Sequence, residues 1–560
     1  MQADSRKIIS ENIVADRSKL KIICVFLHRI YFGRIPYERQ YRGKKRKAMN
    51  ITELQQSYAS HPNVEGVCRL LKDNSVRHLY CGGLYASAAS LFSSVLVQRA
   101  TCPLVFILGD MEEAGYFYHD LTQILGTEQV LFFPSSFRRA IKYGQKDAAN
   151  EILRTEVLSR LQKGEEGLCV VTYPDALAEK VVSRKELGEN TLKLHAGERV
   201  DMNFVTDVLR SYGFEYVDYV YEPGQYAVRG SIIDVFSFSS EYPFRIDFFG
   251  DEVESIRTFE VETQLSKEKK ENIVIVPDLS HSLEKKGSGG MVSFLDFLPS
   301  DSLLAMRDFL WLRERIQTVH DESLTPQAIA ARESEENGAI TLEGKLIDGG
   351  EFTLRALDFR RMEFGNKPTG TPDATVSFHT TVQPIFHKNF DMVAESFREY
   401  LSRHYTIYIC SDSLKQTDRI RAIFEDRGDN ISFTAVERTL HEGFADDTLR
   451  ICVFTDHQLF DRFHKYNLKS DKARSGKVAL SLKELNQFTP GDYVVHTDHG
   501  VGRFAGLVRI PNGDTTQEVM KIVYQNEDVV FVSIHSLHKV SKYKGKEGEA
   551  PRLNLSLIHI

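Results

Sequence analysis

Apolar runs and amphipathic stretches alternate along most of this chain, which predicts an α/β protein. Residues 76–81, 104–108 and 168–172 are short apolar runs of the kind that form buried strands. Residues 151–161 carry apolar positions at helical spacing. A chain of 560 residues is also too long for one hydrophobic core, because single cores stop growing at about 250–300 residues. We therefore expect a multidomain α/β fold.

The pattern changes to successive strands between residues 191 and 277. Ser231–Phe236 and Phe244–Phe249 are rich in β-branched and aromatic residues and are separated by serine and proline, as in consecutive antiparallel strands. A glycine turn then leads into a third run, Val253–Phe259. One amphipathic helix, Met202–Tyr212, precedes these strands. We expect a separate β-rich domain here.

Charged and aromatic side chains make this β-rich domain a candidate surface. Arg229 and Arg245 are predicted to project from neighbouring strands. On the residues alone, an ordinary solvated sheet face is the preferred interpretation, because exposed arginine and aspartate are common on strands. The tyrosines of Tyr216–Tyr221 alternate along a predicted strand and could stack on bases, although strand aromatics more commonly pack on their own sheet.

A strand, a glycine-containing loop and a helix follow one another between residues 76 and 97. Gly83–Ser90 has the GxxxxGK[ST] spacing of a phosphate-binding loop, but Ala88 replaces the second glycine and Ala89 replaces the lysine. Without lysine the site lacks its main cation for the β and γ phosphates, and alanine hinders the close backbone approach that glycine permits. We interpret Gly83, Ala88, Ala89 and Ser90 as a degenerate phosphate loop without bound nucleotide.

A smaller α/β unit is predicted from residue 389 to 467. It has no glycine-rich fingerprint after a strand, so a nucleotide role is disfavoured and a spacer domain is the preferred interpretation. Its predicted helices are Val393–Arg403 and Ser413–Arg427, and its predicted strands are Thr406–Cys410 and Leu449–Phe454.

The last unit combines glycine-rich turns with closely spaced strands. Pro490–Leu507 is followed by the predicted strands Val519–Tyr524 and Asp528–Ile534, which indicates a small SH3-like barrel. An edge strand near Val508–Pro511 would be able to pair with a strand of a partner.

Three side chains in this unit have metal-ligand chemistry. His496, Asp498 and His499 carry the imidazole and carboxylate groups that suit zinc or iron. On a strand that runs into a glycine turn they do not readily converge without a further ligand. A hydrogen-bonded turn held by Asp498 is the preferred interpretation, so no metal site is expected.

Composition narrows the setting of the protein. The seven cysteines form no CxxC pair, so neither a zinc site nor a disulfide framework is indicated. No apolar run approaches the ~20 residues needed to cross a bilayer. The net charge of −7 is mildly acidic. We expect a protein of the reducing cytoplasm with no membrane contact.

The two ends of the chain differ from the rest. The first 48 residues are basic and end in Arg42–Lys47, which fits a nucleic-acid-binding arm. A helical pattern opens after Met49 with Thr52 as a plausible cap. The preferred interpretation is that the protein begins at Met49 and that the leader is mistranslated or disordered. Leu555–Ile560 stops without a fold signal, so we expect a truncated chain.

Two stretches carry a family resemblance. Arg229–Phe236 together with Pro243–Ile256 resembles the UvrA-binding module shared by UvrB and the bacterial transcription-repair coupling factors, the Mfd family. Pro490–Leu507 resembles the CarD-type RNA polymerase interaction domain of the same family. The order of the intervening segments also matches, from Met49 nearly to the end. A UvrB-like domain without its nucleotide site favours the coupling factors over UvrB itself.

The resemblance implies a two-ended adaptor. UvrA contacts fall on Arg229, Arg245 and Phe249, and a contact with the RNA polymerase β subunit falls near Ile510. Catalytic residues are not expected, since the family's translocase would begin after residue 560. ATP, Mg²⁺ and double-stranded DNA would belong to that motor. The alternatives are a CarD-like transcription regulator without a repair role and a UvrB-like nucleotide hydrolase.

The expected architecture is a UvrB-like α/β domain with an inserted β-rich domain, followed by a small α/β domain and a barrel. The expected parts are a leader (1–48), the UvrB-like domain (49–190 and 278–385), the UvrA-binding domain (191–277), the small α/β domain (389–467), a linker (468–480), the polymerase interaction domain (481–548) and a truncated linker (549–560).

Overall fold

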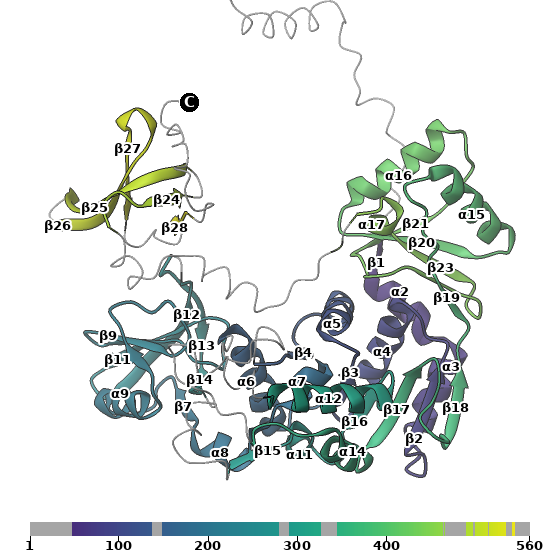
Figure 1. Ribbon diagram of the computed structural model, residues 1–560, viewed down its shortest axis with the longest axis horizontal. Coiled ribbons are helices and arrows are strands. Elements are labelled where there is room, and N and C mark those ends of the chain that lie inside the picture. The colour runs from purple at the N-terminus through teal and green to yellow at the C-terminus, as the bar shows by residue number, and fades with distance from the viewer. Residues whose placement is uncertain are drawn as a thin grey trace, which may run out of the picture. The chain divides into compact units, whose positions relative to one another are not determined.

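The structure is a computed structural model in which helices and sheets follow one another along the chain (Figure 1). It combines parallel and antiparallel sheets with helices, which confirms the prediction of a mixed α/β fold. Several predicted parts lie outside the described residues: the leader except for residue 48, the linker, the truncated end and Asp498. The structure describes residues 48–136, 148–261, 263–278, 290–325, 344–462, 464, 489–496, 499–512, 515–533 and 540–543.

A seven-stranded sheet forms the core of the first α/β domain, in the order β18-β2-β17-β16-β3-β5-β4. All its pairings are parallel. Several strands are buried along their whole length, which explains their unbroken apolar runs. The strands are β2 (His78–Gly82), β3 (Leu104–Ile107), β4 (Val130–Phe133), β5 (Cys169–Thr172), β16 (Leu303–Met306), β17 (Arg360–Gly365) and β18 (Ala374–Ser377).

Strands from before and after the β-rich domain share this sheet, so that domain is an insertion. Strand β6 (Val181–Val182) pairs with β15 (Met291–Val292) beside it. The helices of the domain are α2 (Ile51–Ala59), α3 (Pro62–Leu70), α4 (Ser87–Arg99), α5 (Met111–Leu125), α6 (Ala148–Lys163), α7 (Pro174–Ala178), α8 (Arg184–Glu189), α11 (Phe294–Phe297), α12 (Phe309–Ser323) and α14 (Gly349–Leu357).

The inserted domain is a six-stranded sheet in the order β13-β12-β11-β10-β9-β8, with β7 and β14 paired beside it. Its core includes Val205 and Leu209 of helix α9, together with Ile233 and Ile246 of the sheet. Helix α9 therefore covers one sheet face. The elements are β7 (Leu192–His195), α9 (Met202–Ser211), β8 (Glu215–Tyr216), β9 (Gln225–Arg229), β10 (Ile232–Val235), β11 (Phe244–Phe249), β12 (Glu252–Phe259), β13 (Ser266–Lys270) and β14 (Asn272–Ile275).

The strand predicted over Tyr216–Tyr221 is shorter in the structure, because only Glu215–Tyr216 pairs with β9. The ring of Tyr216 packs edge-on against Tyr226, 5.5 Å between centroids. Tyr219 lies under a guanidinium instead, with the Arg229 Cζ atom 4.9 Å from its ring centroid. These two tyrosines contact their own domain.

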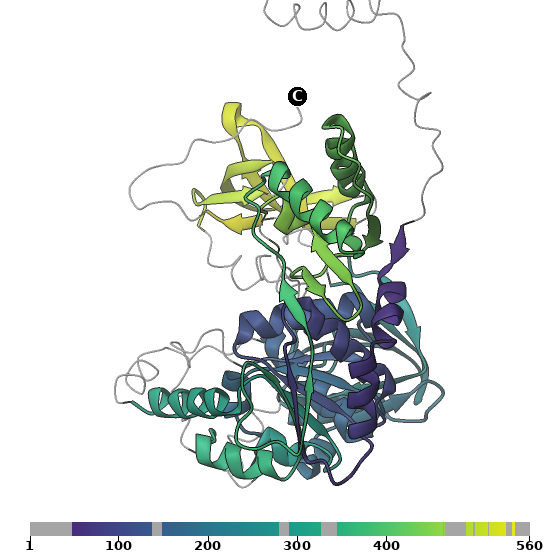
Figure 2. The same cartoon turned by 90° about the vertical axis from the view of Figure 1, so that its right-hand side faces the viewer.

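The small α/β domain extends beyond its predicted bounds. Its sheet has the order β1-β21-β20-β23-β22-β19 and recruits Met49–Asn50 (β1, purple in Figure 2) and Thr380–Val382 (β19). Helix α2 follows β1 and is capped by the Asn50 side chain, not by Thr52, whose backbone N–H donates to that side chain. The other elements are α15 (Phe390–Ser402), β20 (Thr406–Ser411), α16 (Leu414–Asp426), β21 (Thr434–Glu437), β22 (Phe444–Asp446), β23 (Ile451–Thr455) and α17 (Asp456–Leu459).

The last domain is an antiparallel sheet in the order β27-β26-β25-β24-β28. Within it, residues 507–512 of β25 pair with residues 515–520 of β26. Of β25, only residues 500–503 pair with β24. The far half of the β25–β26 hairpin therefore extends beyond β24. The elements are β24 (Tyr493–His496), β25 (Gly500–Asn512), β26 (Thr515–Val523), a 3₁₀ turn η3 (Gln525–Glu527), β27 (Val529–Ser533) and β28 (Val540–Lys542).

Candidate functional site

The face of the inserted sheet opposite helix α9 carries Arg229 and Arg245 around one carboxylate. Asp234 is fully buried and lies directly opposite Arg245 across β10 and β11. Arg245 donates from Nε to Asp234 Oδ1 at 2.8 Å and from Nη2 to Oδ2 at 2.9 Å. Arg229 donates from Nη2 to the same Oδ2 atom. Asp234 therefore fixes the position of both guanidinium groups.

Strand alternation explains how this face arises. In β11, Phe244, Ile246 and Phe248 are buried in the core, while Arg245 and Asp247 point to the other face. Arg245 also packs over the Phe259 ring, with Cζ 4.5 Å from the centroid. Its hydrogen bonds with Asp234 raise the pKa of the guanidinium. The side chain is held rigidly at the sheet surface.

Phe249 is the exposed aromatic group of this region. It ends β11, its side chain is 79 % exposed, and the β11–β12 turn follows it. The preceding residue, Phe248, donates its backbone N–H to the Ser231 carbonyl at 2.9 Å, which joins this end of β11 to the β9–β10 turn. Phe249 and Arg229 thus lie at the same end of the sheet, a geometry suited to a protein-binding anchor.

The degenerate phosphate loop lies between β2 and α4, as the sequence predicts. Gly83 has a φ of +76°, and a Cβ atom there would lie 2.1 Å from the Phe378 carbonyl oxygen. Tyr85 donates its backbone N–H to Thr380 Oγ1 at 3.0 Å, and that hydroxyl donates to the Gly83 carbonyl at 2.7 Å. The chain around residues 378–380 therefore packs directly against the loop.

The N-terminus of α4 is bound to the small α/β domain. The Ser87 hydroxyl donates to Asp120 Oδ2 at 2.6 Å and accepts from the Glu442 backbone N–H at 3.0 Å. Asp120 Oδ1 accepts from the His441 backbone N–H at 2.7 Å, and the Ser87 N–H donates to the Glu442 carbonyl at 3.3 Å. We call Ser87, Asp120, His441 and Glu442 the clasp. The Glu442 carbonyl thus takes one backbone donor of the helix N-terminus, the Ser87 N–H, which a phosphate would otherwise accept from.

The part of the degenerate phosphate loop motif that lies in helix α4 is buried. Ala88 and Ser90 have almost no exposed surface, and Ala89 is 4 % exposed at the wall of a pocket of about 330 Å³. Its charged lining is mainly acidic, with Arg307 paired to Glu113. Burial raises the pKa of Asp120 to about 7. The acidic groups of the lining are Asp110, Glu112, Glu113, Asp120 and Glu442.

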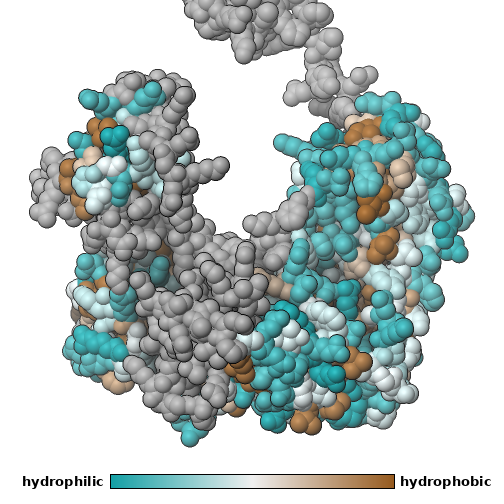
Figure 3. Space-filling model, in the orientation of Figure 1, coloured by the Kyte–Doolittle hydropathy of each residue, from teal (hydrophilic) through white to brown (hydrophobic). Residues whose placement is uncertain are grey.

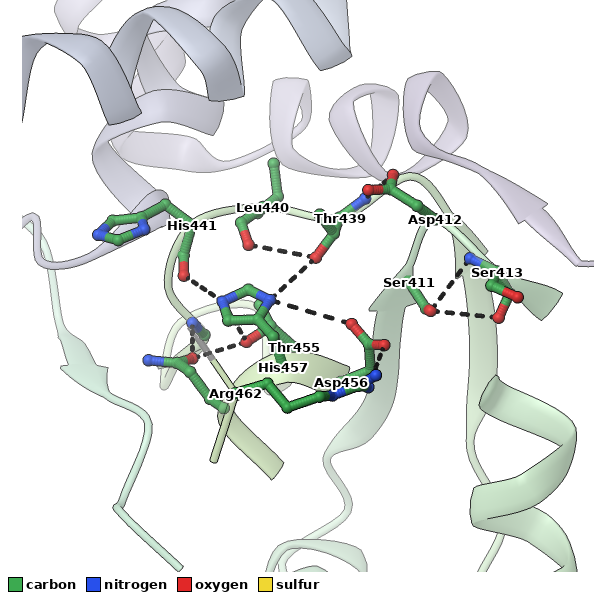
Figure 4. Close-up of polar contacts among 12 residues, drawn as sticks. Ser411, Asp412, Ser413, Thr439, Leu440, His441, Thr455, Asp456, His457 and Arg462 are labelled. Carbon is green, nitrogen blue, oxygen red and sulfur yellow. Dashed lines mark hydrogen bonds and ion pairs between the residues drawn. The ribbon is translucent and has the colours of Figure 1, made fainter. Parts of the chain in front are cut away.

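A buried histidine holds the loop that supplies the clasp (Figure 4). His457 Nε2 lies 2.8 Å from the His441 carbonyl oxygen and Nδ1 lies 3.4 Å from Thr439 Oγ1. Burial lowers the pKa of His457 to about 4, so the ring is neutral near pH 7 and Nε2–H donates to the carbonyl. Asp456 beside it pairs with Arg462 at 2.9 Å. The sequence offered no signal for this network.

Ile510 lies in the extended half of the β25–β26 hairpin, opposite Gln517. Two of the three side chains considered for the disfavoured metal site, His496 and His499, have ring centroids 4.7 Å apart. Among the described residues, no group of three or more histidine, cysteine or acidic side chains is arranged to hold a metal ion.

Two domain families match this chain. The UvrB interaction domain family matches residues 192–281, and the CarD-like/TRCF RID domain family matches residues 488–544. The first match covers the sheet that carries Arg229, Arg245 and Phe249, and the second covers the last antiparallel sheet. The chain thus combines a UvrB-type interaction domain with a CarD-like domain.

Whole-chain comparison matches this chain to transcription-repair-coupling factors. The chain is 24% identical over 536 residues to a transcription-repair-coupling factor of Staphylococcus aureus, covering 84% of this chain and 46% of that protein. It is 22% identical over 549 residues to the transcription-repair-coupling factor of Bacillus subtilis, covering 84% of this chain and 45% of that protein. These findings confirm the resemblance to transcription-repair coupling factors. The chain spans about half the length of these relatives.

The coloured part of the face in Figure 3 is mainly hydrophilic with separate hydrophobic patches. In the described part of the chain, no helix combines the length and the apolar character needed to span a membrane.

Proposed function

We propose that this chain is the adaptor part of a transcription-coupled DNA repair factor, binding UvrA through residues 192–281 and RNA polymerase through residues 488–544. The observation that carries the proposal is the presence of both domain matches in one chain. A cytoplasmic location would give access to both partners. ATP, Mg²⁺ and double-stranded DNA acting through a separate motor remain predictions.

The proposed UvrA surface consists of Arg229, Arg245 and Phe249. Arginine and exposed aromatic side chains are frequent energetic anchors of interfaces. Asp234 holds both guanidinium groups before a partner arrives, which lowers the conformational entropy lost on binding.

Calorimetric titration of the 560-residue chain with UvrA tests this end of the adaptor. Arg229→Glu should abolish or greatly weaken binding, because an anchor cation becomes a repelling anion. Lys193→Glu is the matched control, since Lys193 is exposed on β7, outside the six-stranded sheet. Equal loss in both variants, or no loss in either, would contradict the proposed surface.

At the other end, we propose that the β25–β26 hairpin binds the polymerase β subunit near Ile510. No described strand pairs with the outer edge of residues 507–512, so this edge suits addition of a partner strand. Ile510→Asp should weaken capture of the β subunit, whereas Gln525→Asp, on an exposed 3₁₀ turn of the same domain, should not.

The degenerate loop supports an adaptor over a UvrB-like hydrolase, because the clasp and an acidic pocket surround the place of the phosphates. The CarD-like match favours a second candidate, a polymerase-binding regulator without a repair role. Polymerase binding combined with no UvrA binding by the folded chain would select that candidate.

A further inference from the structure

Three cations stand side by side across the face of the inserted sheet opposite helix α9. Arg245 lies directly opposite Arg257 on β12, and Arg257 lies directly opposite Lys269 on the edge strand β13. Like charges in directly opposed cross-strand positions are destabilising. Asp234 pairs with Arg245 and Asp247 pairs with Arg257, so these two carboxylates offset part of the repulsion along the row. With Arg229, Asp234 and Asp247 these residues form a surface that we call the charge ladder.

The donors of Arg245 are already engaged within the domain. Its Nε and Nη2 atoms bond Asp234, and Nη1 donates to the Gln264 carbonyl at 3.1 Å. Its side chain is only 16 % exposed. A partner contact through this guanidinium would have to compete with hydrogen bonds that already exist.

Arg257 and Lys269 are more available. Arg257 is 42 % exposed and bonds Asp247 through Nη2 alone. Its buried Nε atom has no hydrogen-bond partner among the described residues. Lys269 is exposed on β13 and shares the face of Arg257, because directly paired residues of antiparallel strands point the same way.

We propose that the UvrA-binding surface extends along the charge ladder to Arg257 and Lys269, and that Arg245 acts within it as a positioning residue for Arg229. This inference rests on the proposed function. Four cations against two carboxylates fit an acidic face of a protein partner. Asp247 shares the face of Arg245 and bonds Arg257, and it would repel a continuous phosphate backbone, so a protein partner is favoured over nucleic acid.

Calorimetry with UvrA and the full chain tests the extension. Lys269→Glu should weaken binding several-fold and Arg257→Glu about tenfold, the effect of ~1.4 kcal/mol, while Lys193→Glu should bind as the unmodified chain. Lys269 is exposed, so its substitution should leave the fold intact. Circular dichroism and unfolding midpoints identify any variant that loses structure, and Arg257→Gln replaces Arg257→Glu in that case.

A double-mutant cycle tests the positioning role. Arg245→Gln should weaken UvrA binding in the unmodified chain but add little once Arg229→Gln is present, because both changes then remove the same contact. A merely structural role would destabilise the domain equally in either background. Additive losses of affinity would show that Arg245 makes its own contact and would overturn this part of the inference.

The outcomes separate the two proposals. If the unmodified chain does not bind UvrA, the proposed function fails. If it binds UvrA and loses binding on Phe249→Ala, but binds normally with Arg257→Glu and Lys269→Glu, only the extension fails. Titration with duplex DNA completes the set, since loss of DNA binding in these variants with unchanged UvrA affinity would assign the ladder to nucleic acid and overturn the inference.

Discussion

The charge ladder and the clasp are both built on a buried aspartate, but the two aspartates serve different purposes. In the ladder, a buried carboxylate, Asp234, holds arginines whose outer surfaces remain accessible. In the clasp, a buried carboxylate, Asp120, binds a hydroxyl and a backbone N–H from two domains. Asp234 lies beneath arginines of neighbouring strands and so orders a candidate binding surface. Asp120, in helix α5, lies against the N-terminus of helix α4 and so joins two domains. Position in the fold, not residue type, decides the use.

The largest loss of stability should come from removing the Asp234 carboxylate of the charge ladder. Asp234→Ala leaves two guanidinium groups beside a buried gap, and removing one partner of a buried ion pair costs about 3–5 kcal/mol. Hydrogen exchange of the β10 and β11 amides should accelerate accordingly. Asp218→Ala, at an exposed position of the same domain, is the control. Unchanged protection in Asp234→Ala would mean that the ladder does not depend on its carboxylate.

The same deletion in the clasp should cost less. Asp120→Ala leaves the Ser87 hydroxyl and the His441 N–H without their acceptor, a loss of about 2–3 kcal/mol. Asp120→Asn keeps one acceptor oxygen and should lose less. Hydrogen exchange over residues 439–446 measures the effect. Faster exchange there in Asp120→Ala, with β10 and β11 unaffected, would show that the two carboxylates serve separate joints.

Acidification should weaken the clasp region. Burial lowers the pKa values of His119, His441 and His457 to about 4, so their contribution to stability is present above the unfolded value of 6.5 and is lost as the pH falls towards 4. Asp120, whose pKa burial raises to about 7, acts in the opposite sense, because its contribution is lost as the pH rises to 7. Burial also lowers the pKa of His464 and raises those of Glu442 and Asp456.

The net change should therefore be a loss on the order of 2–3 kcal/mol between pH 6.5 and 5, because three histidines are opposed mainly by Asp120 and each uncompensated proton corresponds to about 1.4 kcal/mol per pH unit. Urea unfolding followed by the fluorescence of Trp311, the single tryptophan, gives the measurement. Asp120→Asn removes one opposing group, so its loss on acidification should be steeper. A loss equal to that of the unmodified chain would contradict the raised pKa of Asp120.

The smallest expected effect is none at all. Ala88→Gly combined with Ala89→Lys restores the phosphate-loop sequence, yet nucleotide binding should not appear. The new lysine would enter a pocket whose wall includes Glu113, Asp120 and Glu442 and would pair with them. Titration with a fluorescent ATP analogue and Mg²⁺ checks this result. Micromolar binding would show that sequence alone, and not the clasp, excludes nucleotide.

Local patterns predicted the elements, and long-range pairing set the rest. Phe244–Phe249 was predicted with the bounds that the structure gives, because its alternation and flanking turns are local signals. Strand β21, Thr434–Glu437, was missed because four residues of mixed polarity give no clear period. The small domain also recruits β1 and β19 from outside its predicted range.

The candidate sites show the same contrast between local sequence patterns and long-range contacts. The resemblance predicts UvrA contacts at Arg229, Arg245 and Phe249, but the sequence did not show that Asp234 joins the two arginines, because that contact depends on strand register. The defect at Ala88 and Ala89 was visible in a local motif. Asp120 and His441 are joined by a hydrogen bond between positions 321 residues apart, and no spacing rule identifies such a pair.

The extended β25–β26 hairpin has a consequence for how its recognition would withstand sequence change. Along residues 507–512 the outer edge offers backbone N–H and C=O groups, except that Pro511 has no N–H, and these groups are the same for nearly every amino acid. A partner strand that pairs with them reads the path of the chain more than its side chains. Side chains of both partners could then change while the backbone pairing persists. The strand geometry of the contact would be retained even where its amino-acid sequence is not.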